Sequence, residues 1–320
     1  MKKTTKIWLI LASVLVVAGL ALSMAVLEAV QWDFSALSTQ PYEETSCEIY
    51  EDFSSISIDG DTVDIFFLPA PDGVCRVTCL KPATEKFTAS VEGDTLVIET
   101  ADERAWYHNI GIFFGETAMT VYLPHTEYGA LSIKGDSSDI VIPEEFFFES
   151  INIMTDTGDV KNYASAAQTI AVQTDTGDIL MEKVSAAAVD CSVSTGDITL
   201  SQIAVEKDVQ MDVTTGDVNA DDVTCQSLIS DGDTGDMLLK NVIARERFLI
   251  GRDTGYITFD GCDAAELSVT TDTGDIKGSL LTDKVFIIRT DTGDVDVPDT
   301  VSGGKCELTT DTGDISIRLA

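Results

Sequence analysis

Apolar and polar residues alternate along the second half of the chain, in a pattern that returns every 19 or 20 residues. Each copy contains a Thr-Gly pair, most often within the run Thr-Asp-Thr-Gly-Asp. The glycines stand at positions 158, 177, 196, 216, 235, 255, 274, 293 and 313. Alternation with a period of two is typical of β-strands, and a constant interval of this length is typical of stacked repeats.

Three columns of apolar residues keep constant distances from these glycines. Two residues after the glycine stand Val160, Ile179, Ile198, Val218, Met237, Ile257, Ile276, Val295 and Ile315. Seven residues before it stand Ile151, Ile170, Val189, Val209, Leu228, Phe248, Leu267, Phe286 and Cys306. Five residues before it stand Ile153, Val172, Cys191, Met211, Ile250, Val269, Ile288 and Leu308, and Ser230 interrupts this column.

A single copy cannot bury such an apolar face, whereas stacked copies bury it continuously. The sequence therefore predicts an all-β fold, a parallel β-helix or β-solenoid of about 9–10 coils over residues 131–320, with 19–20 residues in each coil. An imperfect copy at residues 136–140 would supply the tenth coil.

The Asp-Thr-Gly-Asp run has the composition of a tight corner. The glycine would take the third position of a type II turn, where φ is positive, near +80°. The first aspartate would accept a hydrogen bond from the backbone N–H two residues on, and equivalent threonines would form a ladder between coils. Turn chemistry thus explains the motif without any reaction.

The segment before the repeat has longer strand-like runs without the constant interval. Residues 47–130 contain FSSISID, TVDIFFLP and TLVIETA between turn signals, so we expect an N-terminal β cap domain on the first coil. One group of side chains would either cover the open end of the stack or fill an ordinary core: Trp106, Tyr107, Ile110, Ile112, Phe113 and Phe114. Residues 29–46 are expected to be a linker.

An uncharged apolar run extends from residue 7 to residue 27, which is long enough to cross a hydrocarbon core of ~30 Å as a helix. Lys2, Lys3 and Lys6 precede it, whereas Glu28 and Asp33 follow it. The positive-inside rule therefore predicts a single-pass cell-membrane protein, with a cytoplasmic tip and transmembrane anchor at residues 1–28 and the bulk outside the cytoplasm. A cleaved signal peptide is the alternative, although its apolar region is usually only ~7–15 residues long.

The net charge of −35 argues against a nucleic-acid partner, because phosphate binding needs clustered Lys and Arg. The seven cysteines cannot all pair with one another. Cys75 and Cys79 lie too far apart along one predicted strand to form a disulfide, and a bond from Cys47 to one of them is left open. Cys191, Cys262 and Cys306 occupy apolar positions and are expected to be buried thiols.

Asp-Thr-Gly also carries the catalytic aspartate of retroviral and pepsin-like aspartic proteases. That chemistry needs two carboxylates about 3 Å apart on facing lobes, whereas equivalent residues of a stack lie side by side, ~4.8 Å apart. Two copies even replace the aspartate, by Ser194 and Thr214. The sequence therefore argues against a protease.

A polysaccharide-active β-helix enzyme would need long loops to wall a cleft, but the coils keep a constant length. His108 and His125 lie outside the repeat, and nothing pairs either with a nucleophile. We therefore expect no enzyme activity and assign no catalytic, cofactor-binding or metal-ligating residue.

Two columns of aspartates flank the glycines, and calcium would relieve their mutual repulsion. A calcium-stabilised, β-roll-like binding module is thus an alternative to a solvated acidic edge.

The N-terminal anchor, the opening FSSISIDGDTVDIFFLP, the runs VEGDTLVIET and MTVYLPHTEYGALSIKGDSSDIVI, and the tandem TDTGDI coils occur together. This combination resembles the bacterial putative-adhesin family of β-strand-repeat proteins, a domain of unknown function, over roughly residues 50–320. The resemblance implies a solenoid on the cell surface and transfers no catalytic residue.

Together these patterns predict a non-catalytic, surface-displayed scaffold for adhesion or cell-envelope interaction, whose partner is a glycan or a protein of the envelope. The flat faces between corners offer repeated side chains to a repetitive partner. Outward-facing residues that interrupt the repeat are the candidate contacts, namely Arg245, Arg247, Arg252 and Tyr256. The alternative is a surface cluster that neutralises neighbouring aspartates.

Overall fold

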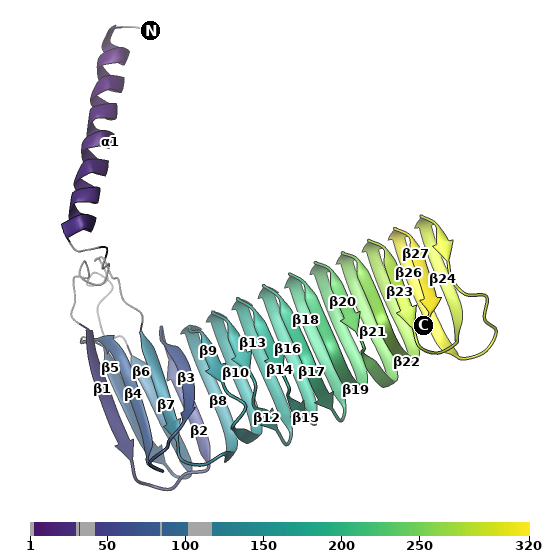
Figure 1. The fold of residues 1–320 in the computed structure, drawn as a ribbon, viewed down its shortest axis with the longest axis horizontal. Helices are drawn as coiled ribbons and strands as arrows, with labels where there is room; N and C mark the ends of the chain where they lie inside the picture. Colours follow the sequence, from purple (N-terminus) through teal and green to yellow (C-terminus); the bar gives the residue numbers. More distant parts are fainter. Residues whose placement is uncertain (1–2, 30–31, 33–41, 84, 102–116) are drawn as a thin grey trace.

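The protein is a long β-solenoid preceded by one apolar helix (Figure 1). The computed structural model describes residues 3–29, 32, 42–83, 85–101 and 117–320. The predicted all-β class and the stack of about ten coils are confirmed. The aromatic group predicted around residues 106–114 lies outside the described residues.

The helix is α1 (Lys3–Ala29). The strands before the regular repeat are β1 (Tyr42–Ile49), β2 (Ser55–Gly60), β3 (Asp64–Pro69), β4 (Cys75–Pro82), β5 (Lys86–Glu92), β6 (Thr95–Ala101), β7 (Ala118–Leu123), β8 (Glu127–Ser137) and β9 (Ile140–Ile142). The repeat comprises β10 (Phe147–Thr157), β11 (Val160–Asn162), β12 (Ser165–Ala166), β13 (Thr169–Thr176), β14 (Ile179–Glu182), β15 (Ser185–Ala186), β16 (Ala188–Thr195), β17 (Ile198–Val205), β18 (Asp208–Thr215), β19 (Val218–Thr234), β20 (Met237–Lys240), β21 (Ile243–Thr254), β22 (Ile257–Thr273), β23 (Ile276–Leu280), β24 (Lys284–Thr292), β25 (Val295–Asp296), β26 (Gly304–Thr312) and β27 (Ile315–Leu319).

One coil shows how the chain turns. β13 runs along one face of the solenoid, the corner at Gly177 reverses the chain into β14, and the short β15 closes the coil before β16 begins. β13 pairs with β16, and β14 pairs with β17, both in parallel and in register. Each residue therefore lies beside its equivalent in the next coil, as the columns in the sequence predict.

The core is built from the predicted columns. Two residues after each corner glycine, eight of the nine side chains are no more than 1% exposed, and Val295 is the exception. The other two columns are buried along the middle of the stack and continue into Ile56, Ile58 and Ile65 of the N-terminal strands. A single apolar core therefore extends through the whole solenoid.

The N-terminal end of the stack is closed by antiparallel strands. The coil formed by β6 and β7 lies outside the coil of β2 and β3, although it comes later in the sequence. Beyond it, β5 pairs antiparallel with β6, and β4 and then β1 follow β7 in the same way. The thiol of Cys47 in β1 contacts the carbonyl of Ala89 in β5, so the two faces meet there.

The order of the coils is also exchanged at the C-terminal end. β26 pairs with β22 on one side and with β24 on the other, and β27 likewise lies between β23 and β25. The last coil of the sequence is therefore inserted between two earlier ones. The outermost coil consists of β24 and β25, at the yellow end of the rod in Figure 1.

The apolar helix α1 stands apart from the solenoid. Its segment Ala12–Ala29 has a mean hydropathy of 2.1 and none of it is buried. By length and composition this helix is able to span a membrane, and a signal sequence shares the same features.

Candidate interaction surface

Each corner of the repeat brings a glycine against the backbone of the neighbouring coil. A Cβ placed on Gly177 would lie 2.1 Å from the carbonyl oxygen of Gly158, and one on Gly216 would lie 1.9 Å from that of Gly196. The corner glycines have φ between 131° and 158°. The expected positive φ is confirmed, but these values lie well above the φ of about +80° that a type II turn requires, so the predicted turn type is wrong.

Eight of the nine corner glycines are followed by an aspartate, and these aspartates link successive coils. The N–H of Asp178 donates to Oδ1 of Asp159 at 3.0 Å, and the N–H of Asp197 donates to Oδ1 of Asp178 at 2.8 Å. The same contact continues to Asp236, whose carboxylate accepts the N–H of Tyr256 at 2.8 Å. These residues form a ladder of backbone-to-carboxylate hydrogen bonds along one edge.

The expected Asx-turn at the first aspartate of the corner is wrong. The N–H of Gly158, which that turn would use, donates instead to the carbonyl of Thr176 in the next coil at 2.9 Å. The first aspartates, such as Asp156 and Asp175, are exposed. The interior threonine three residues before the glycine is the one that bonds to the corner: Oγ1 of Thr310 donates to the carbonyl of Gly274 at 3.0 Å.

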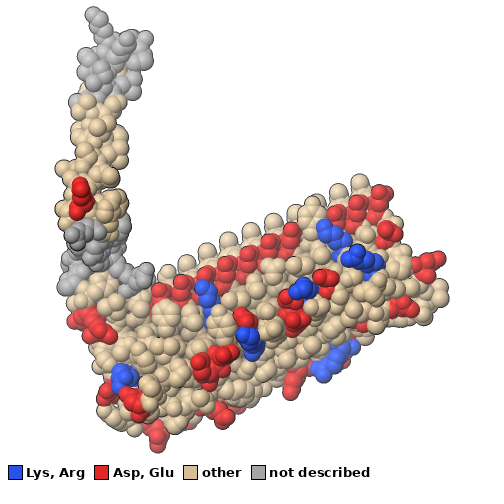
Figure 2. All heavy atoms as spheres, viewed as in Figure 1, with Lys and Arg blue, Asp and Glu red and all other residues tan. Residues whose placement is uncertain are grey.

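The corners therefore produce a continuous acidic edge, visible as the row of red side chains along the rod in Figure 2. Equivalent carboxylates lie side by side on this edge, so the pairs seen there lack the facing arrangement of an aspartic protease. Within the described parts of the chain, no group of three or more His, Cys, Asp or Glu side chains is placed to hold a metal ion.

The four candidate contact residues do not form one site. Arg245 and Arg247 are exposed on β21, and Tyr256 is exposed at a corner, where Nζ of Lys277 lies 5.2 Å from its ring centroid. Arg252 is only 4% exposed, so its predicted outward orientation is wrong.

Arg252 points inward because the neighbouring coil makes room for it. A Cβ on Gly232 would lie 2.5 Å from its Nη1, and its Nη2 donates to Oγ of Ser230 at 2.9 Å. The serine that interrupts the apolar column is thus the partner of a buried guanidinium. Burial lowers the pKa of Arg252, while Asp231 and Asp212 act in the opposite direction.

A shallow groove crosses several coils at the end of each coil where the short strands β12 and β15 lie, away from the glycine corners. One depression of about 410 Å³ and another of about 590 Å³ follow each other along it, and Arg245 lines both. Small side chains form its floor and walls: Ala166, Ala167, Ala186, Ala187, Ala204, Ala244, Ala264 and Ala265. Both volumes fall within the ~300–1,000 Å³ range of ligand sites.

Arg245 reaches along the groove across an intervening coil. Its Nη2 donates to the carbonyl of Glu206, which is 39 residues away in the sequence. Further along, Nζ of Lys284 is buried and bonds to Oδ1 of Asp263 at 2.6 Å. The groove therefore combines a small-residue floor with one exposed guanidinium, while its other cation is already neutralised.

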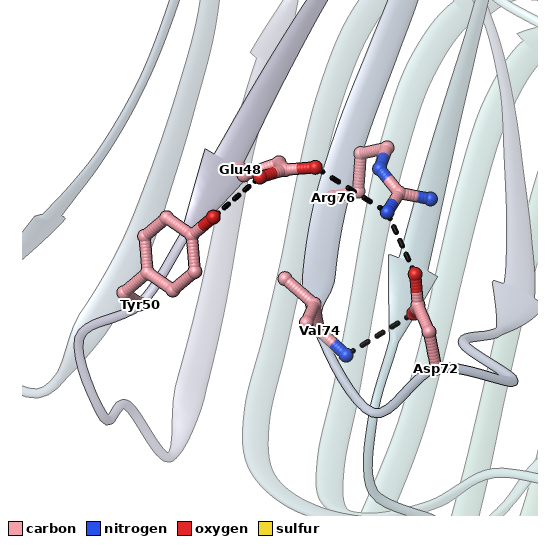
Figure 3. Close-up of polar contacts among 5 residues, drawn as sticks. All are labelled: Glu48, Tyr50, Asp72, Val74 and Arg76. Carbon is pink, nitrogen blue, oxygen red and sulfur yellow. Dashed lines mark hydrogen bonds and ion pairs between the residues drawn. The ribbon is translucent and has the colours of Figure 1, made fainter.

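A second polar cluster lies in the N-terminal strands (Figure 3). Nη2 of Arg76 lies 2.8 Å from Oδ2 of Asp72 and 3.4 Å from Oε1 of Glu48, and the hydroxyl of Tyr50 donates to Glu48. The hydrogen bond from Arg76, with that from the Val74 N–H, lowers the pKa of Asp72, and the bond to Glu48 raises the pKa of Tyr50.

This cluster borders a cavity of about 170 Å³ that is also lined by Phe53 and His125. The cavity is below the usual size of a ligand site, so the groove at Arg245 is the better candidate. The ring of His125 packs against Tyr128, with centroids 6.4 Å apart, whereas His108 lies outside the described residues.

All seven cysteines are free thiols. Cys75 opposes Ile49 and Cys47 opposes Val77 in the antiparallel pair of β1 and β4, so the disulfide left open by the sequence is not formed. Burial raises the pKa of Cys75 to about 12 and that of Cys79 to about 11. These thiols are therefore protonated, unreactive core side chains at neutral pH.

The family model for Toastrack DUF4097 matches residues 53–233 and 207–320. The chain belongs to this family. The predicted resemblance to a bacterial family of β-strand-repeat domains of unknown function is confirmed by this match. The comparison with curated proteins found no match.

Three solved structures illustrate the likeness of this Toastrack chain. A putative lipid binding protein from Parabacteroides distasonis ATCC 8503 is 11% identical with a TM-score of 0.50, and the match covers 88% of this chain and 98% of that chain. A putative adhesin from the same strain is 11% identical with a TM-score of 0.49, over 87% and 98%. A putative adhesin from Bacteroides fragilis NCTC 9343 is 13% identical with a TM-score of 0.42, over 88% and 99%. At these identities the likeness concerns the fold alone.

The groove of this Toastrack protein was not predicted, although a sequence signal for it exists. Ala-Ala pairs recur at residues 166–167, 186–187 and 264–265, at the end of each coil where β12 and β15 lie. The side chains of these pairs are small, whereas the glycine corners carry the larger side chains of threonine and aspartate. A column of small residues at one position of a repeat therefore indicates a depression on the solenoid surface.

Proposed function

We propose that this Toastrack protein is a non-catalytic scaffold at the cell surface that binds an extended envelope polymer, a glycan or a polypeptide, along the groove at Arg245. The observation that carries the proposal is that two depressions follow each other across neighbouring coils. The exposed guanidinium of Arg245 lines both of them. A repetitive partner suits a groove whose walls repeat with the coils.

The chemistry of the described residues supports binding rather than turnover. The carboxylates after the corner glycines accept backbone hydrogen bonds, and the buried thiols are protonated. Arg245 offers several donors in a planar fork, which suits carboxylate, phosphate or sugar hydroxyl groups. The apolar helix α1 supports a location at the membrane, and we infer a single-pass topology with the solenoid outside the cytoplasm.

The test is binding of the full chain in detergent to purified cell-wall fragments and to arrays of glycans and proteins. Saturable binding is expected, and Arg245→Ala should weaken it about tenfold, because a charged hydrogen bond contributes ~1.5–3 kcal/mol. The matched control is Arg247→Ala on the same strand, which should change affinity less than about twofold, within the ±0.5 kcal/mol typical of surface changes.

A second variant tests the groove without changing charge. Ala187→Phe fills the depression and should also weaken binding, whereas unfolding is excluded by an unchanged melting curve. Equal binding by wild type, Arg245→Ala and Ala187→Phe would rule out the groove, and turnover of any bound polymer would rule out a non-catalytic role.

A further inference from the structure

The solenoid is closed at one end and open at the other. In the column two residues after the corner glycine, Val295 is 49% exposed, whereas its eight equivalents are at most 1% exposed. Phe286 and Ile288, whose equivalents in the middle of the stack are buried, are also only partly buried. The apolar core therefore reaches solvent at the outermost coil.

The strand at this end is an unpaired edge. Within the described chain, β24 pairs with β26 alone, so one side of its backbone has no partner strand. Natural edge strands are usually protected by an outward lysine, a proline or a bulge. The middle of β24 instead directs Val285 and Ile287 outward, each 39% exposed. The edge is thus suited to pair with another strand.

The outward residues of this strand are arranged so that two identical copies of it are complementary when they run antiparallel. They are Val285, Ile287 and Arg289, and Asp283 directly precedes the strand; all four are exposed, so the order along the chain is acidic, apolar, apolar, basic. In an antiparallel pair of two such strands centred on Phe286, each Asp283 lies opposite the other strand's Arg289, and each Val285 lies opposite an Ile287. Opposite charges and apolar pairs at such positions each contribute ~0.2–1 kcal/mol.

The other end of the solenoid argues against head-to-tail stacking. There β5 and β1 run antiparallel to the coils and close the core with Phe87, Ala89 and Cys47. An open C-terminal end therefore has no matching open N-terminal end to join. Two C-terminal ends related by a two-fold axis present the same surface to each other, which is a closed, isologous association.

From these observations we propose that the C-terminal edge is a self-association surface, on which β24 pairs antiparallel with β24 of a second copy of this chain. The partner strand covers Phe286 and Ile288 and gives β24 a second neighbouring strand, and the partner's outermost coil as a whole covers Val295 of β25. The two N-terminal helices then lie at the far ends of a rod of doubled length. This inference does not rest on what the groove binds, although Asp283 also lines the second depression of the groove.

The test is the mass of the full chain in detergent, measured by light scattering coupled to size exclusion, at physiological salt. A dimer is expected for the wild type. Ile287→Lys places a charge in the pairing face and should give a monomer. Leu249→Lys is the matched control, because Leu249 has the same position relative to its glycine and is 45% exposed on the interior strand β21; it should remain a dimer.

A charge exchange tests the register. Asp283→Arg places like charges opposite each other at both ends of the pair and should weaken the dimer about tenfold. Adding Arg289→Asp to that variant should restore it. A wild-type chain that stays monomeric up to about 100 µM, well above the micromolar affinities of specific pairs, overturns the proposal, as does loss of the dimer in Leu249→Lys alone. Failure of the double variant to recover overturns the register.

Discussion

At the scale of single residues, the corner glycine is fixed by contact with the next coil. A φ between 131° and 158° is itself a conformation that residues other than glycine rarely adopt, and the neighbouring carbonyl oxygen leaves no room for any Cβ. This explains why Thr-Gly is constant in all nine copies whereas the first aspartate is replaced by Ser194 and Thr214. The replaceable residue is exposed, and the constant one is in backbone contact.

Gly216→Ala should therefore destabilise the protein by about 3 kcal/mol or more, because it combines an unfavourable φ with a steric overlap. Gly93→Ala is the control: Gly93 has φ of 67° but no atom within 4 Å of an added Cβ. It should cost only about 1 kcal/mol, in the range of the conformational term alone. Equal losses of unfolding free energy in urea would show that the stacking contact is unimportant.

At the scale of the structural element, the aspartate ladder has one missing rung. The N–H of Tyr256 donates to Asp236 in the coil before it, but Tyr256 has no carboxylate to accept the N–H of Asp275 in the coil after it. The ladder resumes when the N–H of Asp314 donates to Oδ1 of Asp275 at 2.9 Å. The break lies close to the coil that contains the buried Arg252.

Tyr256→Asp should restore this rung and raise the free energy of unfolding by about 1 kcal/mol, the net value of a typical hydrogen bond. The new carboxylate also lies near Lys277, which offsets the loss of the cation–ring contact. Tyr256→Ala removes the ring without adding the acceptor and should not stabilise. If chemical denaturation shows the two variants to be equal, the carboxylate is not what links the coils.

Much of this element was predictable and some of it was not. Side chains such as Ile179 and Ile198 reveal their burial through a period of two and a constant distance from the glycine. The inward turn of Arg252 has no such signal, because it depends on space left by Gly232 and a hydroxyl on Ser230 in another coil. The exchanged order of the last two coils could not be predicted either. Both coils match the same apolar columns, so either of them could pack next to β22 and β23.

At the scale of the whole molecule, the net charge of −35 includes a row of carboxylates along one edge, beside acidic side chains scattered elsewhere (Figure 2). The carboxylates there repel one another over the length of the stack, and added salt screens this repulsion. Neighbouring coils are held together in spite of it by the continuous core and by the backbone-to-carboxylate ladder. Stability should therefore depend on ionic strength more than on any single ion.

Raising sodium chloride from about 0.01 M to about 0.15 M shortens the screening length from about 30 Å to about 8 Å and should raise the melting temperature by a few degrees. Calcium and magnesium at equal ionic strength should act alike, since no metal-holding group occurs in the described chain. A melting temperature that rises with calcium but not with magnesium would instead favour the calcium-stabilised alternative.

The exchanged order of the last coils bears on how the chain is made. During synthesis, the coil of β24 and β25 leaves the ribosome before β26 and β27, yet its final neighbour is the coil that follows it. Until that later coil exists, the earlier one can dock directly on β22 and β23, whose columns it matches. Completing the native order then requires this coil to move outward and admit the final one. The tip of the rod is thus, like the N-terminal end, a place where growth from the N-terminus cannot simply add coil upon coil.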